Sequence, residues 1–103
     1  MQILHAQNMS ILCIRQYVHI TYRMKKRIYI AQRSRLVSLL REMRIEASLT
    51  QVDLAARIEK DQAYVSRYES GQRRLDVLEV REICQVVGVT LEEFVKRLES
   101  VLK

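Results

Sequence analysis

The stretch LTQVDLAARIEKDQAYVSRYESG, residues 49–71, predicts two short helices joined by a tight turn. Thr50 followed by Asp53 has the spacing of a capping box, in which the hydroxyl accepts from a free amide and the acid reaches back. Asp61 can cap the second helix in the same manner. Gly71 stands where that helix needs a residue of left-handed conformation to end it. We therefore expect helices that begin at Gln51 and just after Asp61.

The apolar residues of this stretch recur at helical spacing. Leu54, Ala55 and Ile58 share one face of the first helix, and Val65 and Tyr68 share one face of the second. Both faces predict a common core beneath the two helices. The second helix then presents Gln62, Ala63, Ser66 and Arg67 outward. A short helix with polar and basic outward residues suits the major groove of DNA.

The pattern L-T-Q-x-D-L-A-x-x-I, then Q-x-x-V-S-R-Y-E-x-G, resembles the Cro/cI-type (Xre-family) helix-turn-helix domain of phage repressors and bacterial regulators. The resemblance covers roughly Arg35 to Leu98. Residues at the family's spacing are Gln51, Ala55, Gln62, Val65, Ser66, Glu69, Gly71 and Gly88. It implies an all-α, five-helix, phage-repressor-like DNA-binding domain that contains a helix-turn-helix.

The chain departs from the family pattern at the ends of two helices. Glu59 and Ser48 stand where the family often has glycine, and Lys60 stands at a position that is often apolar. A non-glycine residue held at positive φ costs on the order of 1 kcal/mol. Either the turn at Glu59 accepts this strain, or the preceding helix runs on and the turn is looser.

Three further helices complete the predicted domain. The helix that precedes this stretch, which is the first of the five, should run from Ala31 or Arg33 to Glu46, with Leu36, Leu39, Leu40 and Met43 as its buried stripe. The fourth opens at Asp76 with Glu79 as a capping box. Its apolar residues Val77, Leu78, Val80, Ile83, Val86 and Val87 lie on more than one side. We therefore expect it to be largely buried. The fifth opens at Thr90 with Glu93, and carries Leu91, Phe94, Val95, Leu98, Val101 and Leu102.

Residues 1–23 differ from the rest because they contain no acidic residue and show no clear helical face. We expect a poorly ordered N-terminal extension over 1–23 and the helix-turn-helix domain over 24–103. Met24 is then a plausible true start. Val18, Ile20, Tyr22 and Met24 alternate as in a short strand. A dimerisation strand, or an arm that contacts DNA, is therefore an alternative.

Composition favours a small helical domain that meets phosphates. The chain has 103 residues, no proline, a net charge of +6 and a pI near 9.7. Cys13 and Cys84 are far apart, with only His5 and His19 as further partners, so we predict no zinc site and no cofactor. Cys84 is expected to be a buried free thiol. Neither a transmembrane segment nor a signal peptide is recognisable, and we expect a cytoplasmic protein.

The resemblance assigns DNA contacts to ten residues. The residues expected to contact base edges are Gln62, Ala63, Ser66 and Arg67. The residues expected to contact phosphate are Gln51, Tyr64, Ser70, Gln72, Arg73 and Arg74. Arg44 and Glu69 match a family pair that joins the first helix to the end of the recognition helix. Each polar residue can also be explained as a solvated helix or loop residue, as can the basic run Lys25, Lys26 and Arg27.

No constellation of catalytic residues is present, so we expect no enzyme activity. The leading interpretation is a sequence-specific regulator of transcription, a repressor, that binds double-stranded DNA as a homodimer associated through the fifth helix. We expect no membrane partner and no small-molecule site. The alternatives are a protein-interaction module, such as an antitoxin-like partner with secondary DNA binding, and a fragment of a larger regulator.

Overall fold

The computed structural model describes the backbone of residues 11–103 and the side chains of residues 21–103. Its helices are α2 (Ile11–Glu46), α3 (Gln51–Arg57), α4 (Gln62–Glu69), α5 (Val77–Val87) and α6 (Leu91–Leu102). The described part of the chain contains no strand, which confirms the predicted all-α fold. The chain divides into two units, Met1–Ala31 and Gln32–Lys103. We call them the N-terminal unit and the C-terminal unit.

The first predicted helix begins much earlier than expected. We placed its start at Ala31 or Arg33, but α2 begins at Ile11. The alternative of a strand around Val18 to Met24 is therefore wrong. No proline or glycine occurs before Gly71, so nothing in the sequence breaks the helix. A segment without a neighbouring strand can pair its amides with its own carbonyls only as a helix. The domain boundary at Met24 stays a prediction.

Local side chains determine where the shorter helices begin. The Thr50 hydroxyl accepts from the Asp53 amide at 3.1 Å, and the Asp53 carboxylate accepts from the Thr50 amide at 3.0 Å. Asp76 and Glu79 form the same reciprocal pair at the start of α5. Asp61 accepts from the Tyr64 amide at 2.9 Å. These three predicted caps are confirmed.

The cap of α6 is simpler than we predicted. The Thr90 hydroxyl accepts from the Glu93 amide at 3.1 Å. The Glu93 carboxylate lies 3.3 Å from Nη2 of Arg97, one turn further along the helix. The start of α6 thus has only the half of the expected capping box that the Thr90 hydroxyl supplies, because the Glu93 carboxylate pairs with Arg97 of its own helix.

The ends of α2, α3, α4 and α5 share one backbone arrangement, in which a residue at positive φ turns the chain out of the helix. These residues are Ser48 at 60°, Glu59 at 57°, Gly71 at 83° and Gly88 at 79°. At α3, the Glu59 amide donates to the Ala56 carbonyl and the Lys60 amide to the Ala55 carbonyl, at 3.2 and 2.9 Å. This pair of bonds is a Schellman motif. The helix therefore stops at Arg57, and the turn accepts the strain at Glu59.

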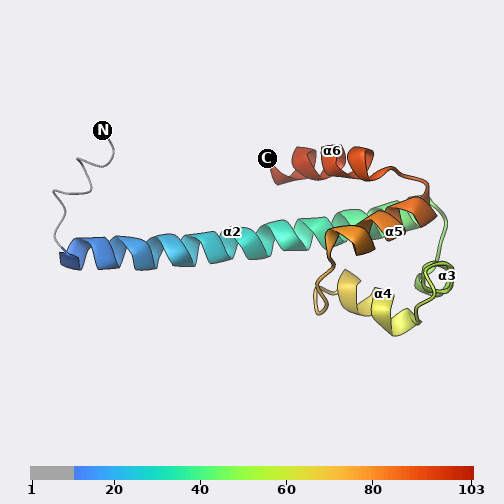
Figure 1. Ribbon diagram of the computed structural model, residues 1–103, viewed down its shortest axis with the longest axis horizontal. Coiled ribbons are helices and arrows are strands. Elements are labelled where there is room, and N and C mark those ends of the chain that lie inside the picture. The colour runs from blue at the N-terminus through green and yellow to red at the C-terminus, as the bar shows by residue number, and fades with distance from the viewer. Residues whose placement is uncertain (1–10) are drawn as a thin grey trace. The chain divides into compact units, whose positions relative to one another are not determined.

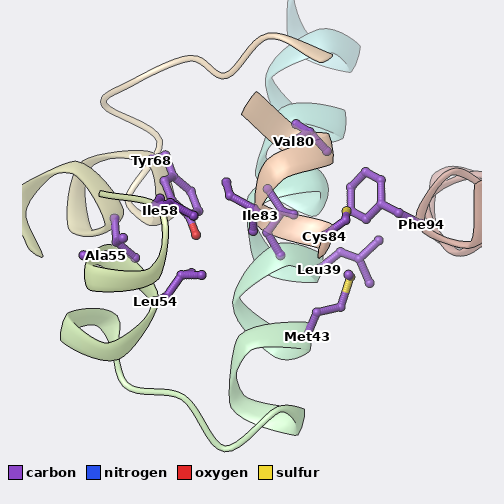
Figure 2. Packing of buried hydrophobic residues seen from close by; sticks show 12 residues of the cluster. Leu39, Met43, Leu54, Ala55, Ile58, Tyr68, Val80, Ile83, Cys84 and Phe94 are labelled. Atoms are coloured by element: carbon purple, nitrogen blue, oxygen red, sulfur yellow. The ribbon is translucent and has the colours of Figure 1, made fainter. Parts of the chain in front are cut away.

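Within the C-terminal unit, α5 lies beside the C-terminal part of α2, with α3 and α4 on one side and α6 on the other (Figure 1). Figure 2 shows Ile83 of α5 between the two halves of the core. One half contains Leu54, Ala55, Ile58 and Tyr68, and the other contains Leu39, Met43, Cys84 and Phe94. The apolar stripes predicted for the helix that ends at Glu46, now α2, and for the helix that begins at Gln51, now α3, are thus confirmed. Cys84 is free and fully buried, and burial raises the pKa of its thiol.

Helix α5 is less buried than its apolar sequence suggested. Val80, Ile83 and Cys84 are buried and Val86 and Val87 are half-buried. In contrast, 66% of Val77 and 72% of Leu78 are exposed. The prediction of a largely buried helix is therefore wrong for its first turn, because no element of the described residues packs over these two side chains.

The described residues show no metal cluster and no membrane helix. No group of three or more histidine, cysteine or acidic residues among them could hold a metal ion. His5 and the side chains of Cys13 and His19 lie outside the described residues. None of the helices searched is both long and apolar enough to cross a bilayer.

Candidate nucleic-acid interface

Helix α4 has a buried side and an exposed side. Val65 and Tyr68 are fully buried, whereas Gln62, Ala63, Ser66 and Arg67 are exposed. We call these four residues the outward face of α4. The helix spacing that turns Val65 and Tyr68 into the core necessarily turns these four away from it. The predicted base-contacting residues are thus brought together on one exposed surface.

A buried ion pair holds the C-terminal end of α4 against α2. Nε of Arg44 lies 2.7 Å from Oε2 of Glu69, and Nη2 of Arg44 lies 3.0 Å from Oε1. The two parallel bonds match the planar guanidinium to the carboxylate. Nη1 of Arg44 also donates to the Leu49 carbonyl at 2.8 Å. The hydrogen bonds that Arg44 donates to the Glu69 carboxylate raise the pKa of Arg44, and the guanidinium stays charged.

Gln51, the first residue of α3, extends this network toward the outward face of α4. Its side-chain amide donates to Oε1 of Glu69 at 3.0 Å. Its carbonyl Oε1 lies 3.5 Å from Nε2 of Gln62, the limit for a weak hydrogen bond. Gln62 therefore keeps most of its hydrogen-bonding capacity for another partner. Gln51 is held by Glu69 but remains partly exposed at the N-terminus of α3.

A second cluster surrounds the half-buried ring of Tyr64. The Tyr64 hydroxyl donates to Oε2 of Glu79 at 2.9 Å, and Nη2 of Arg73 lies 2.7 Å from the same oxygen. The Arg73 guanidinium lies 4.6 Å from the centroid of the Tyr64 ring. The Lys60 ammonium lies 5.5 Å from that centroid. Such contacts are cation–π interactions, and they gather two cations around one aromatic ring.

This cluster changes the acidity of two groups. Burial, followed by the hydrogen bond to Glu79, raises the pKa of Tyr64. The Asp76 amide and the Tyr64 hydroxyl, which both donate to Glu79, lower the pKa of the Glu79 carboxyl. Glu79 is therefore ionised at neutral pH, where it holds both Tyr64 and Arg73. We had predicted the capping role of Glu79 but not its role in this cluster.

The remaining predicted phosphate-contacting residues follow α4. Ser70, Gln72 and Arg74 are exposed, and the Ser70 hydroxyl donates to the Arg67 carbonyl at 3.0 Å. The amides of Gln72 and Arg73 both donate to that same carbonyl, at 2.9 and 3.2 Å. The turn after α4 is thus held by the backbone, and it presents polar side chains beside the outward face of α4.

Comparisons with known proteins agree with this geometry. A family model described as Helix-turn-helix (HTH_3) matches residues 40–94, which include α3, α4 and α5. The structure of an XRE-family like protein from Pseudomonas syringae pv. tomato is 37% identical in sequence. The match covers 76% of this chain and 95% of that one, with a TM-score of 0.71.

Two further solved structures are more distant. The restriction-modification controller protein C.Esp1396I is 27% identical, over 70% of this chain and 96% of its own, with a TM-score of 0.63. The clp gene regulator ClgR from Corynebacterium glutamicum is 20% identical, over 69% of this chain and 76% of its own, with a TM-score of 0.62. At that identity the likeness to ClgR concerns the fold alone. No curated protein matches this chain.

The family model covers more than half of the 103 residues, and the identity to the Pseudomonas protein extends over most of both chains. The matched region contains the capped α3, the turn at Glu59 and α4 with its outward face. This chain therefore belongs to the Xre family of helix-turn-helix proteins.

Proposed function

We propose that this protein is a homodimeric repressor of transcription that reads a specific DNA sequence with α4 in the major groove. Family membership supports the coarser statement that it is a DNA-binding regulator of transcription. The observation that carries the finer proposal is the outward face of α4. It combines exposed amide, methyl, hydroxyl and guanidinium groups on a helix whose other side is fixed in the core.

The chemistry of this face suits the edges of base pairs. The Gln62 amide can pair with adenine through two hydrogen bonds, and the Arg67 guanidinium can pair with guanine. The Ala63 methyl group can contact the methyl group of thymine, and the Ser66 hydroxyl can donate or accept. The Arg44–Glu69 pair and Gln51 limit the movement of α4, so these groups are held in place before DNA binds.

We assign phosphate contacts to the residues around this face, namely Gln51, Tyr64, Ser70, Gln72, Arg73 and Arg74. Support comes from the position of Gln51 at a helix N-terminus, where amides favour an anion. Arg73 forms an ion pair with Glu79, but 40% of the Arg73 side chain is exposed. We expect its guanidinium to contact a phosphate with an N–H group that Glu79 does not use.

We propose α6 as the dimer contact. Phe94 is buried in the core and Leu98 packs against it, so part of the α6 stripe is used within the chain. Val95 lies one turn before Leu98 and two turns before Leu102 on the same side of α6. Val95 is 46% exposed, and Leu98 and Leu102 are half-buried. Two copies related by a two-fold axis could bury this side and hold two recognition helices about 34 Å apart, one turn of DNA.

The experiment that tests base reading begins with selection of the preferred duplex from a random library. Gln62→Ala and Arg67→Ala are then compared with the wild type on the selected duplex and on a scrambled one. We expect each variant to lose about 1 to 3 kcal/mol on the selected duplex and much less on the scrambled one. Equal losses on both duplexes would contradict base reading at that residue.

Sedimentation tests the dimer. Val95→Glu should shift the association equilibrium toward monomer, because it places a charge in the proposed contact. Val77→Glu is the matched control, since Val77 is 66% exposed on α5 and lies outside that contact. A wild type that stays monomeric at micromolar concentration, or equal association of both variants, would contradict the proposed α6 contact.

A further inference from the structure

Most of the net positive charge of this protein lies outside the helix-turn-helix. Of the 18 lysine and arginine residues, five lie in the N-terminal unit, and all 12 acidic residues lie in the C-terminal unit. The five are Arg15, Arg23, Lys25, Lys26 and Arg27. The net charge is therefore +5 in the N-terminal unit. The 13 cations and 12 acids of the C-terminal unit leave only +1.

This distribution matters for any protein that binds DNA. Sequence-independent affinity comes from cations that replace the counterions of the phosphates. Several cations of the C-terminal unit already have an acidic partner, including Arg44 with Glu69 and Arg73 with Glu79. In the C-terminal unit, attraction to phosphate is thus nearly balanced by its own acids.

The described side chains of the N-terminal unit are presented on a helix. Residues 22–30 are all exposed, including Arg23, Lys25, Lys26 and Arg27. Successive residues of a helix differ by about 100° in direction, so Lys25, Lys26 and Arg27 point to three different sides. Cations on several sides of a helix can meet phosphates of both strands of a duplex, whose major groove admits a helix.

We propose that the helical segment 22–30, which we call the basic segment, binds the phosphates of duplex DNA independently of sequence. The inference rests on the proposed DNA-binding function and deepens it. It assigns base reading to the outward face of α4 and most of the general affinity for DNA to the basic segment.

The arrangement of the apolar residues disfavours an anionic membrane as the partner. A helix that lies in a membrane surface gathers its apolar residues on one face. Ile28 and Ile30 are two positions apart and therefore point to nearly opposite sides, yet they are 54% and 57% exposed. Pairing of two basic segments is also disfavoured, because the charge of +4 on each segment meets no acidic residue in the other segment.

The test measures binding to a fluorescein-labelled duplex of random sequence at several salt concentrations. The variant Lys25→Gln/Lys26→Gln/Arg27→Gln removes three charges and keeps residues that favour a helix. Each lost phosphate contact should make the slope of log affinity against log salt shallower by about 0.9, which is roughly eightfold in affinity at 0.1 M salt. We expect a slope shallower by up to about 2.7 for three contacts.

The matched control is Arg81→Gln/Lys96→Gln/Lys103→Gln, which removes three exposed charges from α5 and the region of α6. Its slope should change by less than the slope of one contact. Circular dichroism checks that both triple variants keep the helicity of the wild type. Equal changes in the two variants would mean an effect of net charge alone and would overturn the proposal, as would an unchanged slope in the first variant.

Two further measurements separate the alternatives. If the first variant loses binding to phosphatidylserine vesicles but keeps its binding to DNA, the proposal is overturned in favour of a membrane partner. Gln62→Ala/Arg67→Ala should keep the wild-type slope on the random duplex. If no duplex is preferred in the selection experiment while the basic segment still determines the slope, only the proposed sequence reading fails.

Discussion

Replacement of Glu59 by glycine should stabilise this protein, although it removes a side chain. Glu59 has φ of 57° at the end of α3, in the left-handed region that costs a non-glycine residue roughly 1 to 2 kcal/mol. Glycine avoids this cost but loses more conformational entropy on folding, about 0.5 to 1 kcal/mol. The net gain for Glu59→Gly is therefore up to about 1 kcal/mol, which corresponds to roughly 4 to 8 °C in Tm for a domain of this size.

Thermal unfolding followed by circular dichroism measures this gain. Glu59→Ala is the first control, because it removes the carboxylate and keeps the positive φ. Gly71→Ala is the second, since it makes the opposite change at the equivalent position of α4. A methyl group at Gly71 would meet no atom within 4 Å, so the expected loss comes from the backbone alone.

The order of melting temperatures decides the question. We expect Glu59→Gly above the wild type, Glu59→Ala close to it, and Gly71→Ala below it. If Glu59→Gly melts no higher than Glu59→Ala, the gain does not come from φ and the reasoning is refuted. Ser48→Gly, at φ of 60° after α2, should then also fail to stabilise.

Three further results are expected. Glu69→Ala should cost about 3 to 5 kcal/mol in urea unfolding, because it leaves the buried charge of Arg44 without a partner; a loss below about 1 kcal/mol would contradict this. Tyr68→Phe should gain up to about 1 kcal/mol, because the Tyr68 hydroxyl is buried without a hydrogen-bond partner among the described residues; a clear loss would indicate an unrecognised partner. The lowered pKa of Glu79 means that its contribution to stability is present above the ordinary value of 4.5 and lost as pH falls through the folded value. Melts between neutral and acidic pH should therefore depend less on pH in Glu79→Gln.

Interactions within a few residues could be predicted from the sequence. The cap formed by Thr50 and Asp53, the cap at Asp61 and the stop at Gly71 each depend on groups at most five positions apart. The outward face of α4 could be predicted as well, because helix spacing makes it the complement of Val65 and Tyr68. These parts of the candidate site require only local chemistry and a period of 3.6 residues.

Other features depended on which helices pack against each other in the folded chain. Val77 and Leu78 have the same apolar character as Val80, but no element within the described part of the chain covers them. The start of α2 was missed because the alternation of apolar and aromatic residues from Val18 to Met24 is compatible with a helix as well as a strand, and only a neighbouring strand could have favoured the latter.

By itself, the sequence of this protein determined the helix-turn-helix, its caps and the side of α4 that faces outward, because short-range spacing specifies them. Only the tertiary structure decided that Glu59 accepts a positive φ and that Tyr64 and Arg73 share Glu79, which is 15 residues from one and six from the other. The contact between Tyr64 and Glu79 exists only after α4 and α5 have packed, and no local pattern encodes the distance between them. At Glu59 the sequence allowed both a strained and a looser turn, and the backbone bonds of Glu59 and Lys60 decide between the two.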